Sequence, residues 1–274
     1  MVGLLLRRRP VWLAPAVLAL AACSSTGPGA SRPVSLSVTT RSPAAAPTLS
    51  PASAAITVGS GANSVTLTKV QVVLARIELA TNGPCTVSVA APPGQGESEE
   101  DTCDELQAGP ALVDLPTDGT TRVILDGLVP AGTYNKVQAR LDAVSQPDSD
   151  DVATSASAFL AAHPDWKGVS VKVTGSFTDA AGAAHAFTFT SEVDAEIEAA
   201  FATPVTVGSG TSNVTVAVDV ASWFKDAGGA AIDPMNPANA ESIDRAIRQS
   251  VRAFEDDNHD GMDDHDEGLD GHEP

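Results

Sequence analysis

The sequence predicts an all-β protein, an antiparallel β-sandwich with one C-terminal amphipathic helix. From residue 56 onward, short segments alternate between apolar and polar residues, and turns rich in glycine and proline separate them. A period of two is typical of strands that bury one face, and many such strands favour a sandwich. No strand–helix–strand alternation is present, so a parallel nucleotide-binding sheet is not expected. We expect the sandwich domain to occupy residues 55–255 and to end in the helix.

The first long strand region changes its phase twice. Val65 and Leu67 share one face. The apolar positions then shift to Val70, Val72 and Leu74, and shift again to Ile77 and Leu79. Each change moves side chains to the opposite face, so we expect β-bulges or a bend here. Further strands are predicted at residues 86–90, 111–115, 122–125, 135–143, 169–177, 186–193 and 213–220.

Two segments of the chain resemble each other. Residues 56–67 and 205–216 both place Gly-Ser-Gly between two alternating apolar runs. One interpretation is a pair of hairpins that use the same turn chemistry, and the other is an ancient duplication. The flanking strands match poorly, which favours the two hairpins.

Two helices are predicted. The polar segment 146–167 interrupts the strands, and within it residues 152–162 can form a short helix. The clearer helix covers residues 240–254, where apolar residues follow helical spacing and should dock on the sandwich. That apolar stripe consists of Ile243, Ala246, Ile247, Val251 and Phe254.

Two tryptophans are candidates for sugar stacking. Trp166 closes the polar segment 146–167, where it could be a lid or an exposed platform. Trp223 lies beside Phe224 at the end of a predicted strand, so we expect it to pack in the core.

The N-terminus has the pattern of a secretory signal, residues 1–22. Three arginines precede a short apolar run, which is too short to span a bilayer. The sequence Leu20-Ala21-Ala22-Cys23 resembles the lipobox of bacterial lipoproteins, and the resemblance implies that Cys23 is acylated and becomes the first residue. The alternative is an ordinary cleaved signal. Ser24 favours the outer membrane of a diderm bacterium, and the Ser/Pro-rich residues 23–54 are expected to form a lipidated, disordered tether.

Charge and cysteine content narrow the choice of partners. The formal charge is −19, and loss of the three signal arginines makes it −22. Such a chain should avoid nucleic acid, because both carry negative charge.

If Cys23 is lipidated, Cys85 and Cys103 remain. In an exported chain a disulfide between them is favoured, and it would stabilise the fold by about 3 kcal/mol. Free thiols or a metal pair are the alternatives.

Several motifs resemble one family. The run Val123 to Tyr134, with its Pro-Ala-Gly-Thr-Tyr turn, continues into Lys136–Leu141, and Ser222-Trp-Phe224 precedes Ser250–Asp256. Together these are similar to a family of bacterial lipoproteins that carries a β-sandwich domain of unknown function. The resemblance implies an extracytoplasmic sandwich, and prealbumin- or immunoglobulin-like sandwiches use similar turns. In the turn itself, the Tyr134 ring can pack while its hydroxyl finds a polar partner.

The acidic tail, residues 256–274, contains the sharpest chemical motif. Residues 256–267 fit the calcium-loop pattern D-x-[DN]-x-[DN]-G-x5-E at every specified position. Alternate oxygen ligands converge on one cation, and Gly261 permits the sharp turn. Asp263 stands where EF-hands place an apolar residue, so the loop looks more like dockerin or thrombospondin-type repeats. The predicted calcium ligands are Asp256, Asn258, Asp260, the carbonyl of Met262, Asp264 and Glu267.

Two other interpretations of the tail remain. It can be a solvated acidic segment, or it can hold a transition metal through histidines and these acids. The histidines are His259, His265 and His272, and their spacing fits no tight ligand set.

No common nucleophile, zinc-protease, phosphate-loop or dinucleotide motif is present in the sequence. We therefore expect a lipid-anchored, non-enzymatic binding or structural protein of the cell envelope, whose partner is a glycan or an envelope protein. The alternative is an envelope hydrolase acting on glycans, because the separation of paired carboxylates cannot be read from a sequence. Clustered acids in a deep pocket beside Trp166 would favour the hydrolase.

Overall fold

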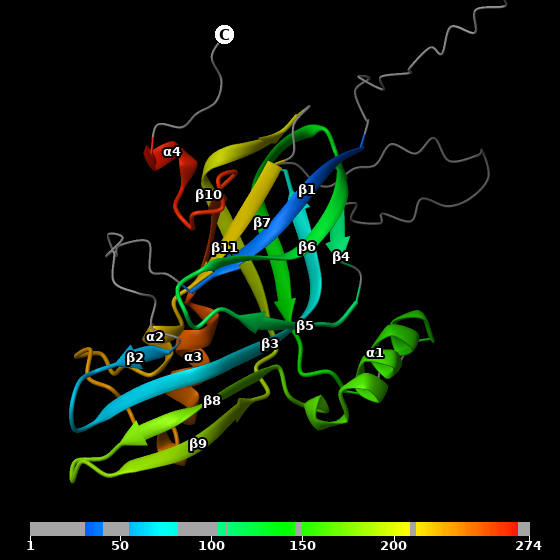
Figure 1. Ribbon diagram of the computed structural model, residues 1–274. Coiled ribbons are helices and arrows are strands. Elements are labelled where there is room, and N and C mark those ends of the chain that lie inside the picture. The colour runs from blue at the N-terminus through cyan, green and yellow to red at the C-terminus, as the bar shows by residue number, and fades with distance from the viewer. Residues whose placement is uncertain are drawn as a thin grey trace, which may run out of the picture.

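The computed structural model describes residues 31–40, 55–81, 104–107, 109–145, 150–208 and 212–267 (Figure 1). The protein is mostly β and contains two sheets, of four and eight strands, as the alternation predicts. None of the helices in these ranges combines the length and the apolar character needed to cross a membrane.

The four-stranded sheet has the order β12–β11–β1–β6. Its strands are β1 (Ser31–Thr39), β6 (Thr121–Pro130), β11 (Ser212–Val218) and β12 (Val251–Glu255). β1 lies in the middle, parallel to β11 and antiparallel to β6, so the prediction of an antiparallel sandwich is wrong for the pair β1–β11. The prediction of a disordered tether as far as residue 54 is therefore wrong over β1. Val34, Leu36 and Val38 alternate inward and are buried, which gives this strand an apolar face despite its polar composition.

The eight-stranded sheet is organised around one long strand, β3 (Ser64–Ala80). Its main path is β10–β7–β3–β8–β9, and three short strands pair with β3 alone. Those three are β2 (Ile56–Val58), β4 (Asp104–Gln107) and β5 (Ala111–Leu115). The others are β7 (Gly132–Leu141), β8 (Val171–Thr178), β9 (Ala184–Ser191) and β10 (Ala195–Val207).

The expected bulges in β3 are confirmed. Residues 64–72 pair with β8 and residues 74–80 pair with β7, with register shifts between Leu67 and Lys69 and between Leu74 and Arg76. A third shift, against β4, lies between Ile77 and Glu78. Gly175 of β8 passes close to the first shift, since a Cβ there would lie 2.1 Å from the carbonyl oxygen of Thr66.

The other strand predictions agree with the structure to different degrees. β5 has the predicted bounds, and β6, β7, β8, β9 and β11 overlap the predicted ranges. β4 and β12 were not predicted as strands, and β10 was predicted only at its end, residues 205–207, as part of the second hairpin. Residues 86–90 lie outside the described residues. The hairpin at 56–67 is confirmed, because β2 pairs with β3. A second hairpin at 205–216 is wrong, because β10 and β11 belong to different sheets.

The described helices are short. α1 (Asp150–Ala162) confirms the predicted helix, and α3 (Ala240–Arg248) buries Ile243 and Ile247. The remaining turns of helix are η1 (Pro164–Trp166), α2 (Val220–Trp223), η2 (Pro237–Asn239) and α4 (Asp264–Glu267).

The prediction that the C-terminal helix continues to Phe254 is wrong. The Ser250 hydroxyl donates to the carbonyl of Ile247 at 2.8 Å and accepts from the Trp223 indole N–H at 2.8 Å. These bonds hold the end of α3, and the chain then pairs with β11 as strand β12. The domain therefore ends in a strand rather than a helix.

Apolar side chains of both sheets meet in two large clusters, and a third lies under α1. Trp223 is fully buried in the first cluster, which confirms its predicted place in the core. The turn between β6 and β7 also matches the sequence analysis, because Tyr134 is buried and its hydroxyl donates to the Pro130 carbonyl at 2.8 Å.

Candidate metal centre

The candidate calcium loop follows directly from strand β12, so no helix enters it. The backbone N–H of Asp256 donates to the Asn213 carbonyl at 3.1 Å, which extends the pairing of β12 with β11. The Asp256 side chain is fully buried. Its carboxylate accepts from the Thr215 hydroxyl at 2.7 Å, and from the N–H groups of Asp260 and Gly261 at 2.9 and 3.0 Å.

Burial raises the pKa of the Asp256 carboxyl above its ordinary value, against the bonds from Thr215 and the loop amides, which lower it. The nearby charge of Asp260 also raises this pKa. The carboxylate is thus the centre around which the loop turns.

Alternate side chains of the loop face its own backbone. Asn258 Oδ1 accepts from the Asp260 N–H at 2.9 Å, and Asp260 Oδ1 accepts from the Met262 N–H at 2.8 Å. Gly261 has a φ of +82°, a backbone conformation that favours glycine. A Cβ at Gly261 would also lie 2.6 Å from the Thr121 hydroxyl, so the turn needs glycine for space as well.

Asp264 contributes a buried oxygen that lacks a partner. The residue is 8% exposed, and its Oδ2 accepts from the Asp257 N–H at 2.6 Å. Its Oδ1 is buried without a hydrogen-bond partner. Burial also raises the pKa of Asp264, and the charges of Asp257, Asp260 and Asp263 add to this rise. A cation is one group that would satisfy such an oxygen.

The structure therefore brings Asp256, Asn258, Asp260 and Asp264 into one turn, with Met262 between them. Glu267 lies in α4, and its side chain is outside the described residues. Within the described part of the chain, no group of three His, Cys, Asp or Glu side chains is arranged to hold a metal ion.

Two of the three histidines that were considered as ligands of a transition metal make contacts with other groups. His259 Nδ1 lies 3.0 Å from the Asp257 carbonyl. The His265 ring lies 3.3 Å from Asp263 and 3.9 Å from Glu255. His272 is outside the described residues.

The loop also covers one end of the outer face of the four-stranded sheet, near Thr39 and Thr121. The polar side chains that β1 and β11 turn away from the core are buried there rather than solvated: Ser37, Thr39, Asn213 and Thr215. The Asn213 amide accepts from Ser37 at 2.8 Å, and donates to Thr215 at 3.1 Å and to the Asp256 carbonyl at 2.6 Å. The acidic loop is thus hydrogen-bonded to two central strands.

Sequence reasoning missed this contact, although a signal for it is present. Ser35, Ser37 and Thr39 alternate with the apolar residues of β1, and Asn213 and Thr215 do the same in β11. Uncharged polar residues on one face of two strands are compatible with either solvent or a polar cover. The alternation alone cannot distinguish between them.

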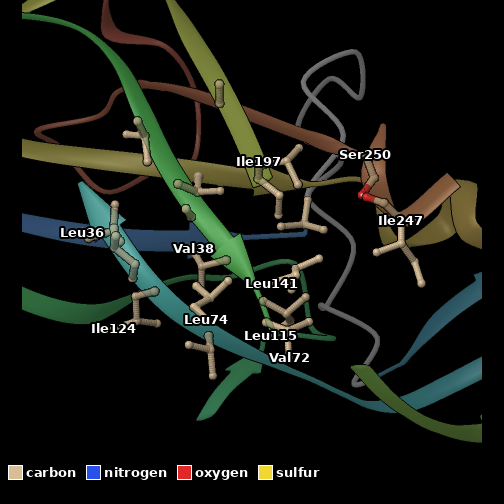
Figure 2. A pocket seen from close by; sticks show the side chains of 18 of the residues that line it. Leu36, Val38, Val72, Leu74, Leu115, Ile124, Leu141, Ile197, Ile247 and Ser250 are labelled. Carbon is tan, nitrogen blue, oxygen red and sulfur yellow. The ribbon is translucent and has the colours of Figure 1, made fainter. Parts of the chain in front are cut away.

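The space between the two sheets is almost filled. A cavity of about 50 Å³ lies between the sheets, lined by aliphatic side chains of both sheets and by Trp223 and Ser250. Figure 2 shows the aliphatic side chains around it and Ser250 at its edge. Ligand pockets for small molecules measure about 300–1,000 Å³. This cavity therefore reflects imperfect packing, and the Ser250 hydroxyl at its edge already has two partners.

A polar groove lies on the outside of the eight-stranded sheet. Its volume is about 390 Å³, and residues of β3, β7 and the start of β10 line it. Arg140 makes two bonds to Asp194, at 3.1 and 2.8 Å, and Arg76 pairs with Glu78. These carboxylates are held by arginines in the structure.

Trp166 does not reach this groove. It is 2% exposed and packs with Val73, Val144, Ala156 and Phe159 under α1, while the Lys172 ammonium lies 4.5 Å from its ring centre. The prediction of a lid or exposed platform is wrong, because the apolar side of α1 covers the ring.

The remaining predicted sites, Cys23, Cys85 and Cys103, lie outside the described residues. A search with protein-family models, curated proteins and solved structures finds no match to this chain.

We predict that Thr215→Val lowers the free energy of unfolding by about 1–3 kcal/mol in calcium-free buffer. The change keeps the side-chain shape but removes a hydroxyl that the buried Asp256 carboxylate and the Asn213 amide both use. Urea denaturation measures the effect. Thr188→Val, at an exposed position of strand β9, is the matched control and should change stability by less than about 0.5 kcal/mol. Equal stability of the two variants would contradict the importance of this network.

Proposed function

We propose that the protein is a lipid-anchored, extracytoplasmic binding or structural protein without enzymatic activity, with a calcium loop at its C-terminal end. The observation that carries its location is the run Leu20-Ala21-Ala22-Cys23 after a charged and apolar signal. We assign the domain to the prealbumin- or immunoglobulin-like sandwiches of the lipoprotein family that the sequence resembles. The proposed site of action is the outer membrane of a diderm bacterium.

We predict that Cys23→Ala releases the protein from membranes. The thiol is the proposed site of acylation, and residues 11–22 are too short an apolar run to hold the chain in a bilayer. Membrane fractionation and detergent partitioning measure the distribution of the variant. Ser24→Ala, which leaves the thiol, is the control and should stay with the membrane. Equal retention of Cys23→Ala would reject lipid anchoring.

We also propose a disulfide between Cys85 and Cys103. The pairing of β3 with β4 supports it, because Leu79 faces Asp104 and the segment with both cysteines therefore begins and ends at neighbouring strands. We predict that the exported protein resists thiol alkylation at both positions until it is reduced. Mass spectrometry of the alkylated, non-reduced protein decides this, and two alkylated thiols would exclude the bond.

Calcium is the cation that the loop residues fit best. The available groups are carboxylate, amide and backbone oxygens, which are the ligands that calcium prefers. The buried Oδ1 of Asp264, which has no hydrogen-bond partner, supports a cation at this position in particular. Asp256, Asn258, Asp260, the Met262 carbonyl, Asp264 and Glu267 would hold the ion. Calcium would stabilise the loop and, through Asp256, the sheet beneath it.

We predict that the mature chain, made soluble by Cys23→Ala, binds calcium with a dissociation constant of about 10⁻⁴–10⁻³ M. Asp260→Asn should weaken binding about tenfold or more, since even partners outside the metal shell contribute about 10–100-fold. Calorimetric titration with calcium measures both.

The matched control is Asp263→Asn. This change removes the same charge from the same loop at a position that the calcium pattern does not use. Its new amide oxygen can still accept from the His265 N–H, as Asp263 Oδ1 does at 3.1 Å. Absence of binding heat in the parent, or equal weakening by both substitutions, would reduce the loop to a solvated acidic segment.

For the sandwich we propose a partner in the envelope, either a glycan or a protein. Two observations support binding over hydrolysis: the cavity between the sheets is small and apolar, and Trp166 is buried under α1 rather than among the residues that line the groove. The hydrolase alternative would have to use that groove. Release of new reducing ends from envelope glycans by the purified protein would overturn the non-enzymatic proposal.

A further inference from the structure

Strand β1 begins only a few residues after Cys23, the proposed lipid anchor. Only seven residues, 24–30, separate Cys23 from Ser31, the first residue of a central strand. Even a fully extended chain of that length spans at most about 25 Å, and a flexible one spans about 15 Å on average. The headgroup layer of one leaflet is about 5–8 Å thick. If Cys23 is lipidated, the end of the domain where β1 begins therefore lies close to the membrane.

That end of the domain carries an apolar surface, which we call the apolar corner and which consists of Pro33, Leu128 and Pro130. In the register of β1 with β6, Pro33 faces Leu128 and Ser31 faces Pro130. The neighbouring Val34 and Val129 are buried in the core, so alternation turns Pro33 and Leu128 outward. Leu128 is 69% exposed, more than any other large apolar side chain among the described residues.

The cover over this sheet does not reach the corner. The calcium loop lies over Thr39 and Thr121, at the other end of the pairing between β1 and β6. The same outer face is thus covered at the end away from the anchor and exposed, with apolar residues, at the end next to it.

We propose that the apolar corner rests in the lipid interface beside the anchor and so fixes the orientation of the domain on the membrane. This inference rests on the proposed lipidation of Cys23. The contact is apolar rather than electrostatic, because a chain with a formal charge of −22 after loss of the signal is not attracted to anionic lipid. A single exposed leucine is common on protein surfaces. Leu128, however, lies at the end of the domain that the short connection to Cys23 would hold near the lipid interface.

The test places a fluorescent reporter at the corner. Full-length protein with Leu128→Trp is produced in a bacterium that lipidates it, and is reconstituted in phosphatidylcholine vesicles with or without bromine on the acyl chains. Trp12 leaves with the signal, and Trp166 and Trp223 are 2% and 1% exposed, so the wild-type protein supplies a constant background. We expect the emission of the new tryptophan to shift to shorter wavelength and to lose intensity in brominated vesicles.

Met235→Trp is the matched control. Met235 is another exposed apolar residue, and it lies between α2 and η2, beyond the end of β11 that is far from Ser31. Its emission should show neither the shift nor the quenching. Near-ultraviolet circular dichroism verifies that both variants keep the native packing around the buried tryptophans.

The outcomes separate the anchor from the corner. Vesicle-bound Leu128→Trp without bromine quenching would overturn the corner proposal and leave lipid anchoring intact. A blue shift without quenching would also overturn it, and would indicate contact with a second protein molecule. Equal quenching at positions 128 and 235 would reject a fixed orientation. Wild-type protein that fails to stay with the vesicles would overturn both proposals.

Discussion

The fold depends on the register shifts in β3, because among the described strands β3 alone connects the two halves of the eight-stranded sheet. Its first part pairs with β8, and its last part pairs with β7. The two neighbours pair with β3 in different registers. The register shifts near Leu67 and Leu74 allow the change, and the absence of a side chain at Gly175 lets β8 approach the first of them. Both halves can then face the four-stranded sheet and share its apolar side chains.

A second constraint joins the two ends of the domain. β1 is the first described strand and the acidic loop is the last described segment, and Asn213 connects them by accepting from Ser37 and donating to the Asp256 carbonyl. These polar groups are buried, so an unsatisfied partner would cost about 1–3 kcal/mol. The loop is therefore part of the structure of the sheet, and a cation held by the loop would act on strands that lie next to the proposed membrane anchor.

The sequence allowed much of the fold to be predicted, and the failures have physical reasons. Val113 and Leu115 identified β5 because they alternate with the polar Asp114. β1 was assigned to a tether because its three apolar residues stand among serines, threonines and prolines, so composition hid the period of two. Val251 and Phe254 were placed on a helix because they continue the spacing of Ile243 and Ile247. Only the tertiary contact with β11, which no local pattern contains, makes that segment a strand. In the loop, spacing alone identified the residues that turn around Asp256, whereas the surface beneath them required the structure.

The two ends of the outer face of the four-stranded sheet differ in polarity, and this difference bears on the proposed orientation of the protein on a membrane. Near Thr39 and Thr121 the outer face of the small sheet is covered by the acidic loop, and near Pro33 and Leu128 it is bare and apolar. A uniform membrane contact along this face would bring the carboxylates of the loop toward the lipid, where unpaired charge is costly. Contact through the corner alone avoids that cost and leaves the loop open to solvent ions. In the proposed arrangement, the sheet meets lipid at one end and a cation at the other, and neither contact disturbs the packed interior between them.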